Sequence, residues 1–315
     1  MASQYEIIAD DNHDIKCKKY KNRGKLGLKY GAIAIISILC CVAILYTMFF
    51  KLLAKPILTQ DFKHMSKDGI IYIVVPCGPN DDERRDAIRR TWKKHLTKVT
   101  TMSFFVGSKN LDGVKLNSLR QEAIIHKDMV FFEEYEDSYI GLTWKMIEIY
   151  KYVVNLNINI KWVIKTDTDA WLNIYEIEKM LLKHEVQTVR GSYVPFGWPV
   201  SAGGTYGNNI YKNTNYPLFP NGGWYSMTYD IVEWIVDQDK RGWLQMMPNE
   251  DAALGIWLSG TPVRMETELS INPDGFLVGN SCQNNQSVVH HIRSDVILKF
   301  GKNFEECGQP CSCDT

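Results

Sequence analysis

An uncharged run over residues 31–50 is the feature that most constrains how this chain folds. The run holds about 20 residues without a single Asp, Glu, Lys or Arg, and a helix of that length spans the ~30 Å apolar core of a bilayer. A helix buried in a globular core more often carries only ~10 to 14 apolar residues in a row. We therefore expect a transmembrane helix here.

The charges before this run predict its orientation. The basic residues that precede it have no acidic residue among them: Lys16, Lys18, Lys19, Lys21, Arg23, Lys25 and Lys29. The positive-inside rule places such a flank in the cytosol. A cleavable signal peptide would show a shorter apolar region and a small-residue cleavage site, which are not evident. The sequence thus predicts a single-pass type II membrane protein with a cytosolic tail at 1–30, an uncleaved signal anchor at 31–50, a stem at 51–69 and a luminal domain at 70–315.

The cysteines fit an oxidising compartment. Five of the eight cysteines fall in the predicted luminal domain: Cys77, Cys282, Cys307, Cys311 and Cys313. A secretory lumen favours disulfides between them, and their odd number leaves one free or intermolecular, with the connectivity open. Zinc in the C-terminal cysteine tail is disfavoured because no histidine lies nearby at the spacing such sites use. A glycosylation sequon at Asn285 adds weak support for a luminal location.

Apolar runs and helical patterns alternate along the predicted luminal domain. We expect buried strands at 70–75, 102–107, 129–132 and 161–165, and helices at 81–94, 116–125 and 142–154. Strands that alternate with helices form a mostly parallel sheet with helices on both faces. The predicted fold class is therefore α/β, in a single domain.

Two carboxylates directly follow the predicted strand at 161–165. Asp167 and Asp169 are separated by one residue, so in extended backbone they point to the same side. In open α/β sheets ligands bind outside the carboxyl ends of the strands, and paired carboxylates there can hold a divalent cation that keeps positions for phosphate oxygens. A polar turn is the alternative on these residues alone. His290 and His291 are candidates to complete the metal site, although a lone histidine is more often structural.

A second Asp-x-Asp pair in the same chain serves as a control. Asp237 and Asp239 lie in a helical pattern, where residues two apart do not face each other, so we expect them on a solvated face. A rival function for the first pair is the nucleophile loop of haloacid dehalogenase-type phosphotransferases, with Asp167 as nucleophile. Trp171 stands where that loop has Thr or Val, which counts against this function.

The basic residues matter by position, because the net charge is zero. The 36 Lys and Arg residues balance the 36 Asp and Glu residues, which excludes a nucleic-acid binder driven by bulk electrostatics. Arg85 and Arg89 are i, i+4 neighbours on the predicted helix after the first strand and suit phosphate or nucleotide contacts. A solvated helix with Asp–Arg pairs is the alternative. Lys145 is a candidate diphosphate contact, or else a surface lysine.

Further candidates follow later in the chain. Gly222 and Gly223 give a backbone that a ligand can approach closely, and Trp224 offers an aromatic face for a sugar ring; a simple turn is the alternative. Asp251 lies at a predicted helix start, where it either only stabilises the helix dipole or also acts as a general base.

Taken together, five blocks in order resemble the β-1,3-glycosyltransferase family, which includes the β-1,3-galactosyltransferases and β-1,3-N-acetylglucosaminyltransferases and, more distantly, the Fringe enzymes. The blocks are RRDAIRRTW, DSYIGLTWK, KTDTDAWLN, NYPLFPNGGWYSMT and NEDAALG, which lie within residues 70–292. Five ordered blocks are far more specific than any one of them. The predicted anchor also fits Golgi glycosyltransferases.

This resemblance implies a nucleotide-sugar-binding fold of the GT-A type and an inverting β-1,3-glycosyltransferase. Such an enzyme moves galactose, N-acetylglucosamine or N-acetylgalactosamine from a UDP-sugar to a glycan hydroxyl on a glycoprotein or glycolipid. The resemblance also implies Mn²⁺ (or Mg²⁺) as cofactor and the Golgi membrane as location, with the oligomeric state, monomer or homodimer, left open.

By position in the family blocks, the candidate residues take on roles. Asp169 would bind the metal, Asp167 would contact the ribose or the metal shell, and Asp251 would be the base. His291, which lies outside the five blocks, is the further candidate metal ligand. The UDP side would carry Arg85, Arg89 and Lys145, and the sugar pocket would be shaped by Gly222, Gly223 and Trp224.

The chain departs from the family blocks at a few positions. Thr168 replaces a middle Asp, but the flanking pair of aspartates remains. Gly141 replaces an Asn, and Trp224-Tyr225 replaces Gly-Tyr. Both of these changes bear on the choice of donor or acceptor. A catalytically inactive sugar-binding protein or chaperone on the same fold would be expected to lack one of the three candidate aspartates. All three are present, which favours an enzyme.

Overall fold

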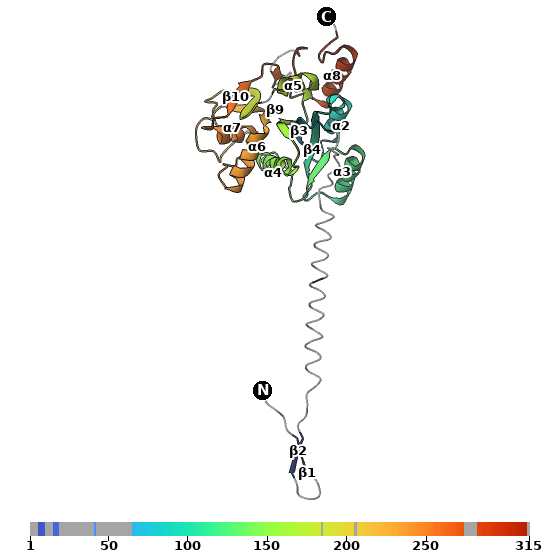
Figure 1. Ribbon diagram of the computed structural model, residues 1–315, viewed down its shortest axis with the longest axis vertical. Helices are drawn as coiled ribbons and strands as arrows, with labels where there is room; N and C mark the ends of the chain where they lie inside the picture. Colours follow the sequence, from blue (N-terminus) through green and yellow to red (C-terminus); the bar gives the residue numbers. More distant parts are fainter. Residues whose placement is uncertain are drawn as a thin grey trace. The chain divides into compact units, whose positions relative to one another are not determined.

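Figure 1 shows a computed structural model of the chain, which describes residues 6–9, 15–18, 41, 65–183, 185–204, 207–273 and 282–313. The chain divides into two compact units, Met1–Lys55 and Pro56–Thr315. In the first, β1 (Glu6–Ala9) and β2 (Ile15–Lys18) pair antiparallel. Apart from Cys41, the predicted anchor lies outside the described residues. Within the described part, no helix is both long and apolar enough to cross a membrane.

A seven-stranded sheet forms the centre of the second unit, in the order β10-β8-β9-β6-β3-β4-β5. Its strands are β3 (Ile70–Pro76), β4 (Thr100–Gly107), β5 (Met129–Phe132), β6 (Ile160–Thr166), β8 (Thr188–Val194), β9 (Phe219–Thr228) and β10 (Arg264–Thr267). Strand β9 runs antiparallel to β6 and β8, and the other neighbouring pairs are parallel. The predicted mostly parallel α/β sheet is confirmed and fits a GT-A-like fold.

Helices cover both faces of this sheet (Figure 1). One face packs on α4 (Leu142–Asn155), α6 (Tyr229–Lys240) and α7 (Glu250–Leu258), and the other on α2 (Asp82–Arg90), α3 (Gly113–His126), α5 (Ile174–Leu181) and α8 (Ser294–Cys307). Both faces of the sheet are apolar because the side chains of a strand alternate between them, as strand β3 shows. Tyr72 and Val74 join the core with α4, whereas Ile71 and Ile73 join the core with α2. Each fully buried aliphatic side chain contributes roughly 1.5–3 kcal/mol, so both faces must be covered.

A small second sheet fixes the segment that ends in two histidines. Strand β12 (Val288–Val289) pairs parallel with β11 (Ile271–Asn272) and antiparallel with β7 (Trp171–Leu172). Beyond β12, the backbone N–H of Ile292 donates to the carbonyl of Asp169 at 3.1 Å. This pairing brings a segment more than 100 residues away in the sequence beside the carboxylates that follow β6.

The predicted helix at 81–94 differs from the observed one. Helix α2 ends at Arg90, and a 3-10 helix, Trp92–His95, continues the chain. The break lies at Thr91, whose hydroxyl donates to the carbonyl of Ala87 at 2.7 Å. A threonine side chain that bonds back to the carbonyl four residues earlier competes with the regular helix, which explains the interruption.

Four of the five predicted luminal cysteines form disulfides, Cys282–Cys311 and Cys307–Cys313. Cys77 is free and buried, as expected for an odd number of cysteines. Burial raises the pKa of its thiol to about 12, against the lowering effect of Lys145. Such a thiol is inert as a nucleophile at neutral pH.

Candidate active site

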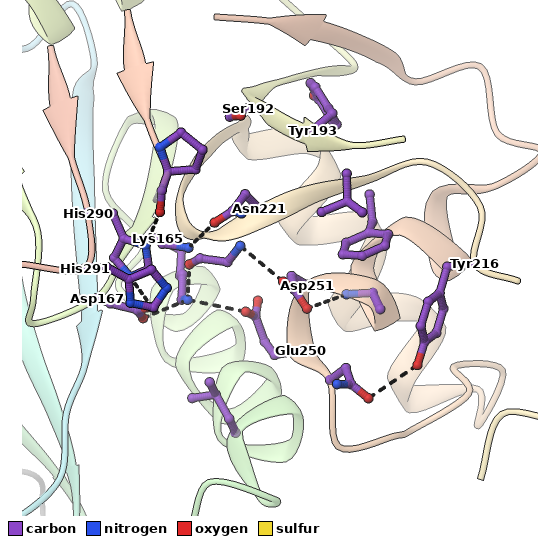
Figure 2. A pocket seen from close by; sticks show the side chains of 18 of the residues that line it. Lys165, Asp167, Ser192, Tyr193, Tyr216, Asn221, Glu250, Asp251, His290 and His291 are labelled. Atoms are coloured by element: carbon purple, nitrogen blue, oxygen red, sulfur yellow. Dashed lines mark hydrogen bonds and ion pairs between the residues drawn. The ribbon is translucent and has the colours of Figure 1, made fainter. Parts of the chain in front are cut away.

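A pocket of about 810 Å³ lies at the carboxyl ends of β3, β6 and β8, beside the first half of β9 and the start of α7 (Figure 2). Its lining includes most of the candidate residues: Asp167, Asp169, Gly222, Gly223, Asp251, His290 and His291. Open α/β sheets bind ligands at this edge. The topology therefore gathers side chains that are far apart in the sequence into one cavity.

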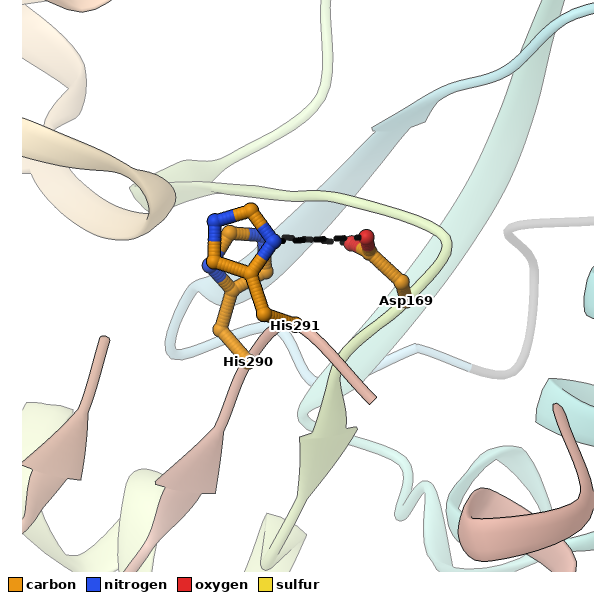
Figure 3. A group of neighbouring side chains, drawn as sticks. All are labelled: Asp169, His290 and His291. Carbon is orange, nitrogen blue, oxygen red and sulfur yellow. Dashed lines mark ion pairs between the residues drawn. The ribbon is translucent and has the colours of Figure 1, made fainter. Parts of the chain in front are cut away.

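Asp169 and the two histidines form a candidate metal centre, drawn in Figure 3. Asp169, His290 and His291 each offer one ligand atom, and these atoms all lie within 4.8 Å of one another. His290 Nδ1 lies 2.8 Å from the carbonyl of Pro273. When this nitrogen carries the proton, the neutral ring presents its Nε2 lone pair to the centre, as is usual for metal-binding histidines.

The donor set fits a transition metal such as Mn²⁺. A carboxylate suits Mn²⁺ and Mg²⁺ alike, whereas imidazoles favour transition metals over Mg²⁺, which prefers oxygen ligands. His290 Nε2 lies 3.1 Å from Asp169 and 3.4 Å from Asp167. Burial alone would lower the pKa of His290, but the two carboxylates outweigh it and raise the pKa to about 9. The two carboxylates thus favour a cation beside them, a place that His290 takes when it is protonated.

Asp167 forms an ion pair with a buried lysine. Lys165 Nζ, on a side chain that is 1% exposed, lies 2.8 Å from Asp167 Oδ1 and 3.4 Å from Glu250 Oε2, and it donates to the carbonyl of Gly222. Burial would raise the pKa of Asp167, but Lys165 and His290 outweigh it and hold the pKa well below its ordinary range. Asp167 is therefore ionised and has a partner on each oxygen.

Asp251 is the carboxylate that faces the pocket from the start of α7. Its Oδ2 accepts from the N–H of Gly222 at 3.2 Å and its Oδ1 from the N–H of Ala252 at 2.8 Å. Burial raises the pKa of Asp251, against the N–H of Ala252 and the charge of Lys165, which lower it. Because each carboxylate oxygen keeps a further lone pair, Asp251 can accept a proton from a bound hydroxyl.

The neighbouring Glu250 is less available. Tyr225 donates its hydroxyl to Glu250 Oε1, and Tyr225 lies 2.8 Å from the hydroxyl of Tyr150, while Lys165 approaches the second carboxylate oxygen. Burial raises the pKa of Glu250 to about 7, although Lys165 lowers it. Both carboxylate oxygens of Glu250 are engaged inside the protein, so Glu250 helps to hold Tyr225 and Lys165 in place. Asp251 remains the better candidate for the base.

The sequence predicted a close approach to the backbone of Gly222 and Gly223. The groups that lie close to these glycines are side chains of the protein, Asp251 and His290. A Cβ on Gly222 would lie 3.1 Å from Asp251 Oδ2, and a Cβ on Gly223 would lie 2.1 Å from His290 Nδ1. Trp224 does not line the pocket; it is 1% exposed and packs in the core with α2. Tyr225, the next residue of β9, joins the core on the opposite face of the sheet, as the alternation of side chains along a strand requires.

Replacing Gly223 by alanine should therefore displace His290. The ring cannot retreat freely, because it is 5% exposed and bonded to Pro273. We expect the Gly223→Ala variant to bind Mn²⁺ about 10-fold more weakly or worse, as is usual when the groups that orient a ligand are disturbed. Titration of Mn²⁺ measures this. Gly113→Ala is the matched control, since its Cβ meets no atom within 4 Å; equal affinities in both variants would contradict the assignment of His290.

The structure does not bring Arg85 and Arg89 to the pocket. Arg85 is fully buried and donates two hydrogen bonds, both of 2.7 Å, to Glu122, and Arg89 binds Glu122 and Asp128. Both arginines lie on the face of α2 that packs inward. Arg84 lines the pocket instead, 3.8 Å from Asp169 and 3.3 Å from the hydroxyl of Thr168.

These internal ion pairs predict a stability effect. Glu122→Ala would leave Arg85 buried without its carboxylate, which typically costs about 3 kcal/mol or more, whereas Glu305→Ala, in an exposed pair with Lys94, should cost under ~1 kcal/mol. The arginines hold the pKa of Glu122 below its ordinary 4.5, against the raising effect of burial. Its stabilisation is thus fully present above pH 4.5 and is lost as pH falls through the lowered pKa. Urea unfolding of both variants at pH 7 and at pH 3 tests this; equal losses at pH 7 would contradict it.

Lys145 also has an internal role. Its Nζ donates to the carbonyl of Cys77 at 2.8 Å and pairs with Asp137, and the side chain is 4% exposed. It ties the end of β3 to the segment before α4 and does not line the pocket. Nearby, a Cβ on Gly141 would meet the hydroxyls of Tyr135 and Ser138, so the Asn of the family block would fit only if these side chains shifted.

Three charged residues of the pocket lining were not selected from the sequence: Arg84, Lys165 and Glu250. Lys165 and Glu250 stand inside family blocks, directly before Thr166-Asp167 and Asp251, so their positions offered a signal. Nothing local distinguished Arg84 from Arg85. That distinction depends on which side of α2 packs against Glu122.

Comparison with known proteins independently supports the family resemblance. Residues 83–268 match the family described as Galactosyltransferase. A UDP-GalNAc:beta-1,3-N-acetylgalactosaminyltransferase 2 of Xenopus laevis is 26% identical over 199 residues, which cover 62% of this chain and 39% of that protein. A Beta-1,3-galactosyltransferase 1 of Mus musculus is 28% identical over 196 residues, covering 60% and 59% respectively. The matched segments thus span less than two thirds of these relatives.

Proposed function

The chain belongs to the galactosyltransferase family, and from this membership we propose that it is an inverting, metal-dependent β-1,3-glycosyltransferase. Its donor is a UDP-sugar carrying galactose, N-acetylgalactosamine or N-acetylglucosamine, and its acceptor is a glycan hydroxyl on a glycoprotein or glycolipid. The relatives bear the names of β-1,3-N-acetylgalactosaminyl- and β-1,3-galactosyltransferases, which supports this reaction class.

One observation carries the proposal: a candidate metal centre and a candidate base face the same pocket from different elements. Figure 2 shows His290 and His291 on one side and Asp251 on the other. Asp169 lies with the histidines, Gly222 donates to Asp251, and a Cβ on Gly223 would meet His290. A diphosphate near the first group would present its sugar to the second.

In the proposed reaction the chain supplies orientation, charge and a base. Asp251 removes the proton of an acceptor hydroxyl, whose oxygen attacks the anomeric carbon from the face opposite to UDP, so that a single displacement inverts the configuration. Arg84 lies where it can balance negative charge on the departing UDP. A divalent cation held by Asp169, His290 and His291 would supply Lewis-acid neutralisation of the diphosphate.

Two other functions have less support. An inactive sugar-binding protein would be expected to have lost one of its catalytic aspartates, and Asp167, Asp169 and Asp251 are all present in the pocket. A phosphotransferase needs Asp167 as a free nucleophile. Here both of its oxygens have partners, Lys165 and His290.

For the cell biology, we propose a single-pass type II protein of the Golgi membrane with its catalytic domain in the lumen. The support is the uncharged run at 31–50 with its basic flank, together with two disulfides, which persist in oxidising compartments.

The test of the proposed function is UDP release by the full-length protein in detergent. The donors are UDP-galactose, UDP-N-acetylgalactosamine and UDP-N-acetylglucosamine, each with and without Mn²⁺, on mixed glycan acceptors. We expect release with one donor that requires both Mn²⁺ and an acceptor. Phosphate release without any acceptor would instead favour the phosphotransferase.

A further inference from the structure

One buried lysine contacts both the carboxylates after β6 and the part of the pocket that holds the candidate base. Lys165 is the residue before the last of β6, and its side chain is 1% exposed. Its Nζ lies 2.8 Å from Asp167 Oδ1 and 3.4 Å from Glu250 Oε2, and it donates to the carbonyl of Gly222. Figure 2 shows Lys165 between Asp167 and Glu250. The three contacted groups, which come from three different elements, match the three N–H donors of an ammonium group.

The backbone at Gly222 has little support from strand pairing. The register of β9 with β6 ends at Trp224, and its register with β8 is interrupted from residue 221 to residue 224. Among the described strands, residues 221–223 therefore have no register partner. Two of these residues are glycines, whose backbone is the least restricted of all. The position of Gly222 thus depends on the side chains that bind it.

Two side chains bind Gly222, one at its carbonyl and one at its N–H. Lys165 donates to the carbonyl, and Asp251 Oδ2 accepts from the N–H at 3.2 Å. Lys165 is therefore connected to the candidate base through a single residue of backbone. A second connection runs through Glu250, which pairs with Lys165 and directly precedes Asp251 in α7.

The same ammonium group also orients a carboxylate beside the candidate metal centre. Asp167 pairs with Lys165 through Oδ1, and its Oδ2 lies 3.4 Å from His290 Nε2. Lys165 is not part of the centre itself, which consists of Asp169, His290 and His291. A change at Lys165 should therefore spare the candidate metal ligands but disturb the alignment of the base with them.

We propose that Lys165 is a positioning residue for sugar transfer, which holds Asp251 in place relative to the bound donor. This inference rests on the proposed function and adds to it a residue that acts through the base. Such positioning matters because a displacement of reacting groups by about 1 Å can cost about 100-fold in rate. The alternative is a structural role alone, in which Lys165 only neutralises two buried carboxylates. That role would lower stability and leave the kcat of the folded protein unchanged.

The first test separates kcat from donor binding. Methionine has a similar length to lysine and no charge, so full-length Lys165→Met protein is assayed with Mn²⁺, the preferred UDP-sugar and mixed glycan acceptors. We expect kcat to fall at least about 10-fold, and the Kd values for Mn²⁺ and for UDP with Mn²⁺ to change much less. Glu122→Ala is the control, because it disturbs buried ion pairs outside the pocket. A loss confined to the Kd values, or an unchanged kcat, would overturn the proposal.

A charge-balanced variant keeps this test decisive if the single variant does not fold. Removing a buried cation leaves its carboxylates unpaired, which is costly, so Lys165→Met is also combined with Glu250→Gln. The combined variant loses one positive and one negative charge. Its kcat should lie at least about 10-fold below that of Glu250→Gln alone. Equal kcat values in these two proteins would contradict a positioning role.

The final experiment asks whether Lys165 acts through Asp251. Residues that act as a unit have non-additive effects on catalysis. Once Asp251 is replaced by asparagine, adding Lys165→Met should therefore lower the remaining kcat by less than about 2-fold, whereas a structural role predicts the same fold loss in both backgrounds. Equal fold losses would refute the proposal. If the unaltered protein transfers no sugar from any donor, the proposed function itself fails, a result distinct from each of these.

Discussion

Replacing Asp251 by asparagine should reduce sugar transfer by about 10²–10⁴-fold, the usual contribution of a general base, while UDP binding is retained. The amide has the size of the carboxylate and its oxygen can still accept from one of the two backbone N–H groups, Gly222 or Ala252, that Asp251 now binds. It cannot accept the proton of the acceptor hydroxyl at neutral pH. Transfer rates measure the first effect, and titration with UDP in the presence of Mn²⁺ measures the second.

The control for this variant is Asp295→Asn. Asp295 also lies in the first turn of a helix, α8, but is exposed, pairs with Arg293 and does not line the pocket. Both substitutions remove a charge that favours the helix dipole, so any loss common to them reflects helix stability. Wild-type transfer by the Asp251→Asn protein would refute the base assignment and direct attention to Glu250.

Replacing Asp169 by asparagine should remove the dependence of UDP binding on Mn²⁺. Asp169 is the carboxylate that lies with both histidines in the candidate metal centre, and an amide oxygen is a much weaker ligand than a charged carboxylate. We expect the affinity for Mn²⁺ to fall by at least about 10-fold, a loss typical even of disturbed outer-shell groups. Mn²⁺ titration, followed by UDP titration with and without the ion, measures this.

The chain contains its own control for this experiment. Asp237 belongs to the second Asp-x-Asp pair, and it lies on α6, is 51% exposed and pairs with Arg241 at 2.8 Å. Asp237→Asn should leave both titrations unchanged. If Asp169→Asn binds UDP and Mn²⁺ as the unaltered protein does, the metal centre must be assigned elsewhere.

Much of the fold followed from local pattern. The strand at Met129–Phe132 has the predicted bounds, and α4 differs from its predicted range by one residue at its carboxyl end. Alternating apolar runs and helical periods report burial over a few neighbouring residues, which is enough to place elements. They do not report strand order, so the antiparallel β9 and the small sheet of β7, β11 and β12 emerged only from the structure.

The candidate site was predictable in part for the same reason. The aspartates after β6 and at the start of α7 were found because their positions in the sequence mark the ends of elements. Arg85 and Arg89 were placed with the ligand because a helix face rich in arginine looks the same whether it meets a phosphate or an internal carboxylate. Their partners, Glu122 and Asp128, come from α3 and the residue before β5.

By itself, the sequence determined the alternation of strands and helices, the membership of the family and the three aspartates on which the proposed chemistry depends, since these follow from local patterns and ordered blocks. Tertiary structure decided which basic groups meet them. It turned Arg84 to the pocket and Arg85 into the core, and it brought His290 to Asp169 through the pairing of β12 with β7. The physical reason is that a side chain's role depends on its neighbours in space, and these are supplied by elements that only the fold brings together.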